Sequence, residues 1–97
     1  MNTPMIQTVR PLPERRLLVS FINGGRRVYD CRAIMGLERF YPLYGEVFFK
    51  TATVDAGGYG VSWNDEVDLS EYELWHNGAE PGSGLEQRDI ALYQVGR

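Results

Sequence analysis

The stretch that decides the fold is Arg16–Cys31, which reads RLLVSFINGGRRVYDC. Its first part combines aliphatic, β-branched and aromatic residues, and alternate positions from Leu17 to Phe21 place apolar side chains on one face of a strand. Asn23–Gly25 follows, and these residues tolerate the positive φ angles that a tight hairpin turn requires. Arg26–Cys31 reads as the returning strand. The sequence therefore predicts a β-hairpin here.

The segments on either side of this hairpin have weaker patterns. Met5–Arg10 is predicted to be a short extended segment, closed by a Pro-Leu-Pro run that excludes a helix. Residues 32–44 contain several apolar side chains that could support one or two helical turns. Gly36 and Pro42 prevent a long helix, so we expect a covering loop with short helical pieces.

A second hairpin is predicted further along the chain. Val47–Asp55, which reads VFFKTATVD, has the composition of a strand. Ala56–Gly58 supplies a turn, and Tyr59–Asn64 reads as the next strand.

A short helix is predicted at about residues 71–77. With Ser70 as the N-cap, Glu73 falls at the third helical position, where the two residues can form a capping box. Leucines on both sides of the cap are spaced as a hydrophobic staple. Asn77-Gly78 predicts a left-handed C-terminal stop.

Three carboxylates, Asp65, Glu66 and Asp68, lie within four positions just before this helix. They could form a metal or acid/base site, or they could belong to a corner where a strand leads into the helix. A calcium loop needs a glycine at its bend and a distant bidentate Glu, and the stretch has neither. We interpret it as the corner, with acidic residues favourably placed near the helix N-terminus.

These elements predict a small α+β fold, an antiparallel sheet of two β-hairpins with short helical segments. Residues 1–78 are expected to form one domain, and 79–97 a linker followed by a C-terminal segment. That segment contains the apolar residues Ile90, Leu92 and Tyr93. It either docks on its own domain or adds to another chain, and an open sheet edge in so short a chain favours a homodimer.

Composition and charge limit the function classes. The single cysteine excludes an internal disulfide, and no apolar run approaches the length of a membrane span, so we expect a cytoplasmic protein without membrane contact. The net charge is −3, but residues 1–39 carry seven arginines against three carboxylates, and 40–97 carry three cations against ten. Such asymmetry suits a nucleic-acid face, attraction between chains, or hairpin partners that mix the charges.

The residue chemistry predicts no catalytic, cofactor or metal site. His76 is alone at the end of the predicted helix, where it can interact with free carbonyls. Cys31 has no metal-ligand spacing and is expected to be a small buried residue. Gly57–Gly60 lies between two predicted strands, whereas a phosphate loop leads into a helix.

The order of landmarks resembles the bacterial family called domain of unknown function 2442. The landmarks are Phe21–Gly24, Asp30, Phe48 or Phe49, Val54-Asp55, Gly60, Trp63, Asp68-Leu69 and Leu74-Trp75. The resemblance spans about residues 5–78 and implies a small α+β fold without an established activity. Some members carry a helix-turn-helix domain after this unit. Others resemble one half of a two-gene pair of the toxin–antitoxin kind.

Three hypotheses about function remain at this point. The first is a non-catalytic protein-interaction or regulatory module, with Arg26, Arg27 and the apolar residues of the C-terminal segment as contact residues. The second is a nucleic-acid-binding protein that uses the arginines of the N-terminal half, which would have to cluster on one surface. The third is an enzyme or metal protein built on the acidic cluster before the helix.

Overall fold

The computed structural model describes residues 3–81 of the chain. Its strands are β1 (Ile6–Leu12), β2 (Arg16–Phe21), β3 (Arg26–Asp30), β4 (Thr53–Val54), β5 (Gly60–Ser62) and β6 (Asp68–Ser70). The two α-helices are α1 (Glu46–Phe49) and α2 (Glu71–Asn77). Three 3-10 helices complete the elements: η1 (Cys31–Ala33), η2 (Glu38–Tyr44) and η3 (Ala56–Gly58). The chain therefore has the small α+β fold that the sequence predicts.

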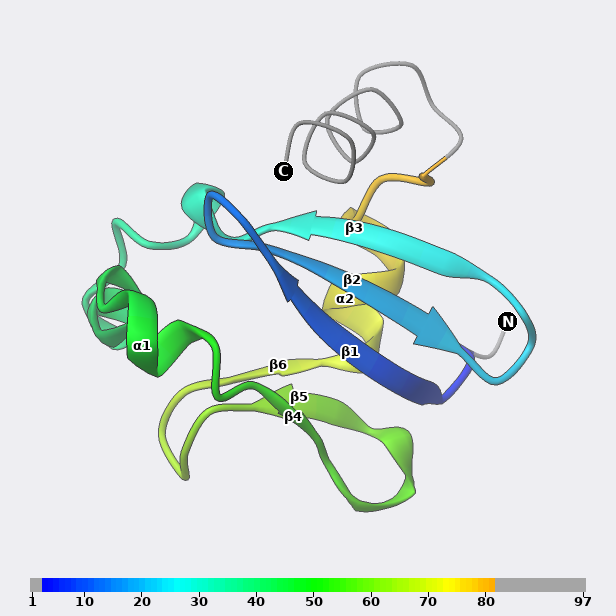
Figure 1. Cartoon of the computed structure of the whole chain (residues 1–97). Helices are drawn as coiled ribbons and strands as arrows, with labels where there is room; N and C mark the ends of the chain where they lie inside the picture. Colours follow the sequence, from blue (N-terminus) through cyan, green and yellow to red (C-terminus); the bar gives the residue numbers. More distant parts are fainter. Residues whose placement is uncertain (1–2, 82–97) are drawn as a thin grey trace.

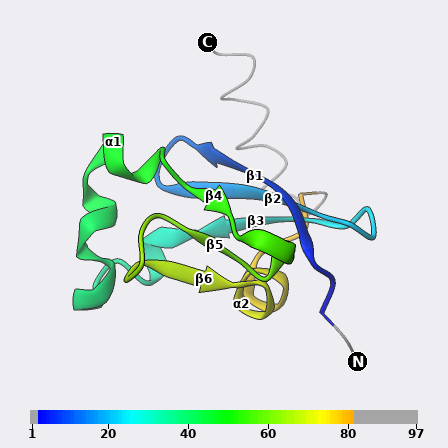
Figure 2. The same ribbon diagram turned by 90° about the horizontal axis from the view of Figure 1, so that it is seen from below.

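The strands form two antiparallel three-stranded sheets, ordered β1-β2-β3 and β4-β5-β6. The sheets lie in two layers, with α2 on the same side of the first sheet as the second sheet (Figures 1 and 2). One continuous hydrophobic core contains residues from both sheets, from α2 and from the segment between Cys31 and Phe49. The sequence predicts two-stranded hairpins, and the structure adds a third strand to each.

The hairpin of β2 and β3 is confirmed. The register pairs Arg16 with Asp30 at one end and Ser20 with Arg26 at the other. At the turn Gly24 has φ = 89°, a left-handed conformation that glycine adopts without steric cost. The alternate residues Leu17, Val19 and Phe21 are buried, as a half-buried strand requires.

The segment before the hairpin is a full strand, β1, rather than a short extended piece. It pairs with β2 along its length, including the position where Pro11 lies opposite Leu17. Proline is tolerated because β1 is an edge strand of its sheet. Such a strand has a neighbour on one side only, so the missing N–H of proline breaks no hydrogen bond to a strand on the other side. The turn into β2 has positive φ angles at two residues that are not glycine, Glu14 at 63° and Arg15 at 61°.

The predicted strand at Val47–Asp55 is wrong in its first half. That part is the short helix α1, and within the predicted range only β4 is a strand. A run of adjacent apolar residues fits either structure, and here the tertiary contacts decide. The helical turn buries Phe49 in the core while Val47 remains 83% exposed, and the indole N–H of Trp63 donates to the Phe49 carbonyl at 2.8 Å.

The acidic stretch is a hairpin turn followed by a strand, β6, which the sequence did not predict. The Asn64 side chain accepts hydrogen bonds from the backbone N–H groups of Glu66 and Val67, both at 2.8 Å, and so builds the turn itself. β6 pairs with β5 and leads directly into α2. The interpretation as a corner is therefore right for Asp68, which starts β6, while Asp65 lies in the turn.

The predicted helix at 71–77 is confirmed with the same bounds. The Ser70 hydroxyl accepts from the Glu73 backbone N–H at 3.1 Å, which is the expected N-cap bond. The left-handed stop is wrong, because Gly78 is extended with φ = −81° and ψ = 156°. Glycine is required there for space, since a Cβ atom would lie 2.6 Å from the Leu74 carbonyl oxygen and 2.8 Å from Arg27 Cβ.

We predict that Glu14→Asn increases the free energy of unfolding by about 0.5 kcal/mol. A left-handed conformation costs a residue with a long side chain roughly 1–2 kcal/mol, and asparagine adopts it more readily. Urea unfolding of the full chain measures the change. Glu14→Gln is the matched control, because it removes the same charge and keeps the strain. Equal stability of the two variants would contradict this account of the turn.

We predict that Ser70→Ala lowers the free energy of unfolding by about 1 kcal/mol, because the Glu73 N–H loses its acceptor at the helix start. Ser70→Asp should remain within a few tenths of the wild-type value, since aspartate also caps helices. Chemical denaturation followed by far-UV circular dichroism compares the three proteins. An alanine variant as stable as the aspartate variant would show that the cap contributes nothing.

Candidate functional site

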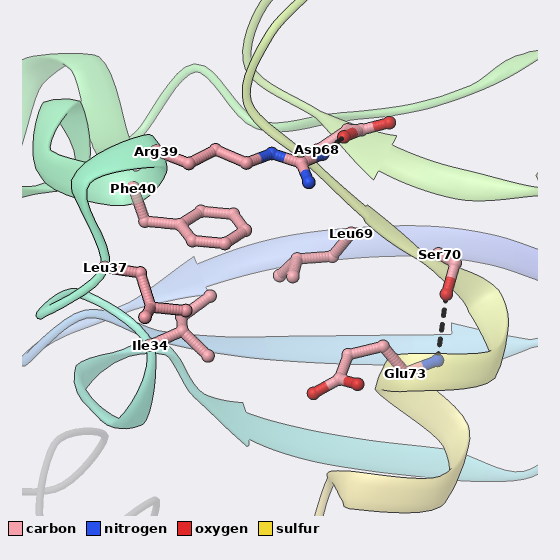
Figure 3. Close-up of a pocket in the computed structure, with 8 residues that line it drawn as sticks. All are labelled: Ile34, Leu37, Arg39, Phe40, Asp68, Leu69, Ser70 and Glu73. Atoms are coloured by element: carbon pink, nitrogen blue, oxygen red, sulfur yellow. Dashed lines mark hydrogen bonds and ion pairs between the residues drawn. The ribbon is translucent and has the colours of Figure 1, made fainter.

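A groove of about 500 Å³ lies between the segment 34–40 and the corner where β6 meets α2 (Figure 3). It joins parts of the chain that are about thirty residues apart in sequence. We call it the corner groove. Its lining residues are Ile34, Leu37, Arg39, Phe40, Asp68, Leu69, Ser70 and Glu73.

The floor of the corner groove is apolar and fixed by the core. Phe40 and Leu69 are buried members of the core cluster, and Ile34 packs against that cluster while partly exposed. Leu37 is different, because its side chain is 58% exposed at the edge of the groove. The groove therefore offers rigid apolar walls and one apolar side chain that a partner could cover.

The upper rim in Figure 3 is an ion pair. The Arg39 guanidinium donates through Nη2 to Asp68 Oδ1 and through Nε to the Glu66 carbonyl at 3.3 Å. Both side chains of the pair are about half exposed, so their attraction is screened by water and adds little to stability. Its effect is geometric, because it holds the arginine against the turn before β6.

The opposite end of the groove is set by a hydrogen bond from β3. The Tyr29 hydroxyl donates to Glu73 Oε2 at 2.7 Å, and the tyrosine is only 3% exposed. Burial, and then the Glu73 carboxylate, raise the pKa of Tyr29 well above its usual value of 10, so it remains a neutral donor. The Glu73 carboxylate thus points to β3 rather than back to the Ser70 backbone. Only the Ser70 half of the predicted capping box forms.

Several exposed apolar side chains lie in the segment that begins at Leu37. Of the seven large apolar residues that are exposed within 3–81, four lie in the segment 37–47: Leu37, Tyr41, Tyr44 and Val47. The rings of Tyr41 and Tyr44 contact each other edge to face, with centroids 6.4 Å apart. We call this segment the η2 ridge. Exposed apolar residues so close in sequence are typical of a protein contact surface.

The acidic cluster does not converge on one point. Asp65 and Glu66 are exposed in the turn, whereas Asp68 is paired with Arg39. In the part of the chain that the structure describes, no group of three His, Cys, Asp or Glu side chains is placed to hold a metal ion.

The predicted contact arginines have different environments. Arg26 is exposed at the start of β3. Arg27 is a structural residue: its guanidinium lies 3.6 Å from the Trp75 ring centroid, and its Nε donates to the Trp75 carbonyl at 2.9 Å. The predicted contact residues Ile90, Leu92 and Tyr93 lie outside the described residues.

The other arginines of the N-terminal half are spread over the molecule. Arg15 donates to the Leu43 and Tyr44 carbonyls at 2.9 and 2.8 Å. Arg32 pairs with Asp30 at 2.8 Å, and its hydrogen bonds and charge outweigh the burial of Asp30, so the pKa of that carboxyl falls below 3.8. Arg16 is buried under the β1–β2 turn and donates to the Pro13 carbonyl. The positive charge counted in sequence is therefore largely used in separate intramolecular contacts.

The remaining candidates for chemistry are packed against neighbouring groups. Cys31 is fully buried in the core, and burial raises the pKa of its thiol to about 12, which disfavours the reactive thiolate. His76 stacks on Tyr72 with ring centroids 4.1 Å apart.

Within residues 3–81 no helix has both the length and the apolar character needed to cross a membrane.

We predict that Tyr29→Phe lowers the free energy of unfolding at pH 7 by roughly 1.5 kcal/mol, because a half-buried carboxylate loses a hydrogen-bond donor. The raised pKa of Tyr29 also favours its neutral form in the folded state. Its contribution is complete below pH 10 and is lost as the pH rises above 10, where the unfolded tyrosine ionises first.

Urea unfolding between pH 7 and pH 11 tests both statements. Wild type should lose more stability above pH 10 than Tyr29→Phe does. Tyr72→Phe is the matched control, because Tyr72 is exposed on α2 and its change should stay within about 0.5 kcal/mol. Parallel pH curves for wild type and Tyr29→Phe would refute the assignment.

Comparison with family models identifies a family for this chain. The model of the family described as "Protein of unknown function (DUF2442)" matches residues 6–80, which include every strand and both α-helices of the described fold. No curated protein and no solved structure matches the chain significantly. The matched range covers most of the 97 residues and agrees with the resemblance seen in the sequence, so the chain belongs to the DUF2442 family of proteins of unknown function.

Proposed function

We propose that the protein is a non-catalytic protein-interaction module, in which the corner groove and the η2 ridge together hold a segment of a partner protein. The observation that carries this proposal is the position of Leu37. It belongs to both surfaces and is more than half exposed, beside a floor made of buried core residues. Covering such a side chain is favourable by about 1.5 kcal/mol or more.

The charges around the groove indicate the chemistry of the partner. Asp68 and Glu73 line it, exposed Asp65 and Glu66 lie in the turn beside it, and its one lining cation, Arg39, is paired with Asp68. A partner segment with an apolar side chain next to a lysine or arginine would complement both the floor and the rim.

The positions of the arginines support a protein partner over nucleic acid. A nucleic-acid surface needs cations in a patch that follows phosphates. Here Arg15 and Arg27 hold backbone carbonyls and Arg32 holds a carboxylate, each in a different part of the described fold. A regulatory role, such as the partner half of a two-gene pair, agrees with this contact surface.

We predict that random-sequence peptides displayed on phage, selected on the immobilised full chain, will be enriched in apolar residues next to Lys or Arg. A synthetic peptide from the enriched set should bind the wild-type protein in calorimetry. Leu37→Asp should weaken its binding at least about tenfold, because an anchor residue of this kind often contributes more than 1 kcal/mol.

Ile22→Asp is the matched control, since Ile22 is equally exposed but lies in the β2–β3 turn, outside the groove and ridge. It should change the affinity less than about twofold. The proposal fails if no peptide family is enriched, or if the peptides bind the Leu37 and Ile22 variants equally well.

A further inference from the structure

The second sheet ends at β6, and this strand borders the corner groove. The sheet order is β4-β5-β6, so β6 has a neighbouring strand on one side only. All three of its residues, Asp68–Ser70, line the groove. Figure 3 shows them across the groove from the segment 34–40. A partner segment in the groove therefore meets the edge of a strand as well as an apolar floor.

The hydrogen bonds that flank the β5–β6 pair show how the backbone of β6 is oriented. The Trp63 N–H donates to the Val67 carbonyl at 2.9 Å. The Glu71 N–H donates to the Tyr59 carbonyl at 3.0 Å. In an antiparallel pair, residues that exchange hydrogen bonds alternate with residues that do not. The residues of β6 that point their backbone groups to β5 are therefore those with odd numbers.

This alternation leaves backbone groups of β6 at its free edge. Leu69 lies opposite Val61 in the register and directs its N–H and C=O to β5. Asp68 and Ser70 have the other parity, so their N–H groups and the Asp68 C=O point away from β5. Within residues 3–81 these three groups have no hydrogen-bond partner at that edge. They are the groups that an added strand would use.

Neighbouring side chains stop short of these three groups. At one end, Arg39 bonds to the Glu66 carbonyl and to the side chain of Asp68, which leaves the Asp68 backbone open. At the other end, the Ser70 hydroxyl accepts from the Glu73 N–H. A complete capping box would return the Glu73 carboxylate to the Ser70 N–H, but that carboxylate is bonded to β3 instead. The half-formed capping box thus leaves a donor at the strand edge.

The other strand edges of the described fold are covered or blunted. Ala79 pairs with Val28 at the edge of β3 through two backbone hydrogen bonds, of 2.7 and 2.9 Å. β1 carries Pro11, and η3 packs so closely on it that a Cβ atom on Gly58 would lie 2.5 Å from the Ile6 carbonyl oxygen. β4 has two residues and lies beside β1 (Figures 1 and 2). Among the described strands, β6 is the one best placed to accept another strand.

We propose that the partner segment binds in extended form and adds to β6 as an antiparallel strand, an inference that rests on the proposed function. The partner residue opposite Asp68 exchanges two hydrogen bonds with it, and a residue two positions away accepts from the Ser70 N–H. The strand pairs of both sheets are antiparallel, and this arrangement is slightly more stable per residue than parallel pairing.

Strand addition also gives the adjacent apolar and cationic residues of the partner separate places. Successive side chains of a strand point to opposite faces. The partner residue opposite Leu69 shares its face and lies toward the apolar floor of the groove. The next residue lies opposite Asp68, where a lysine or arginine forms a cross-strand pair with the carboxylate. Exposed Asp65 and Glu66 lie in the turn beyond it and favour the same charge.

Backbone methylation of the bound peptide tests this proposal with the full chain. The probe is a synthetic peptide of the enriched set described above. An N-methyl group on its Lys or Arg residue removes the N–H that donates to the Asp68 carbonyl, and should weaken binding in calorimetry at least about tenfold. The matched control carries the N-methyl group on the adjacent apolar residue, whose N–H points away from β6. It should weaken binding less than about threefold.

The result separates this inference from the proposed function. A selection that enriches no peptide removes both. A peptide that binds, but loses equal affinity at the two positions or more at the apolar one, overturns antiparallel strand addition and leaves the proposed function standing.

Amide hydrogen exchange of the isotope-labelled protein is the second measurement. In the free protein, Asp68 and Ser70 should exchange faster than Leu69, which bonds to β5. Saturating peptide should slow both at least about tenfold, because their N–H groups gain acceptors. Unchanged exchange with peptide bound overturns the proposal. So does slow exchange in the free protein, which would identify the chain itself as the cover, or a second copy where the slowing grows with protein concentration.

Discussion

β2 pairs with β1 on one side and with β3 on the other, and its residues Leu17, Val19 and Phe21 are at most 1% exposed. The rest of the structure depends on this central strand. Its register with β3 places Tyr29 opposite Leu17, on the inner face, where the hydroxyl reaches Glu73 of α2. A shift of one residue would turn these side chains to the other face and remove both the core and the end wall of the corner groove.

The same strand fixes α2 at its other end. Phe21 contacts the Trp75 ring edge to face at 4.8 Å, and Arg27 covers that ring with its guanidinium. Both residues lie on the inner face of the first sheet, so the helix is held by one aromatic contact, one cation–π contact and the Tyr29 hydrogen bond. These contacts act at two positions of α2, Glu73 and Trp75, and together they set the orientation from which Glu73 faces the groove.

Local signals predicted the parts of the fold that local chemistry controls. The turn at Gly24 and the cap at Ser70 depend on residues within a few positions, and both form as expected. The errors have a tertiary cause. The apolar run around Phe49 is compatible with a strand or a helix, and only packing in the core selects the helix. β6 is too short to show the alternation of apolar and polar residues that is typical of a strand.

The candidate site could not be read from the sequence because its two halves, 34–40 and 68–73, meet only in the folded chain. Charge counting had the same weakness. It treated Arg27 as a contact residue, whereas the fold places this side chain on Trp75. A count of arginines describes the potential far from the molecule, but their partners decide which of them a ligand can reach.

The groove combines side chains whose orientation is fixed by contacts inside the protein with one exposed side chain, Leu37. Arg39, Asp68 and Glu73 are oriented by hydrogen bonds inside the protein, and Phe40 and Leu69 are fixed by packing. Groups held in this way lose little conformational entropy when a partner binds. Leu37 is more than half exposed, so burial does not restrain its side chain. Most of the side-chain entropy lost on this side of an interface would therefore come from this one short side chain, at a cost of about 0.5–1 kcal/mol. Covering its apolar surface would return more than that amount, which supports the proposed role of this corner in partner binding.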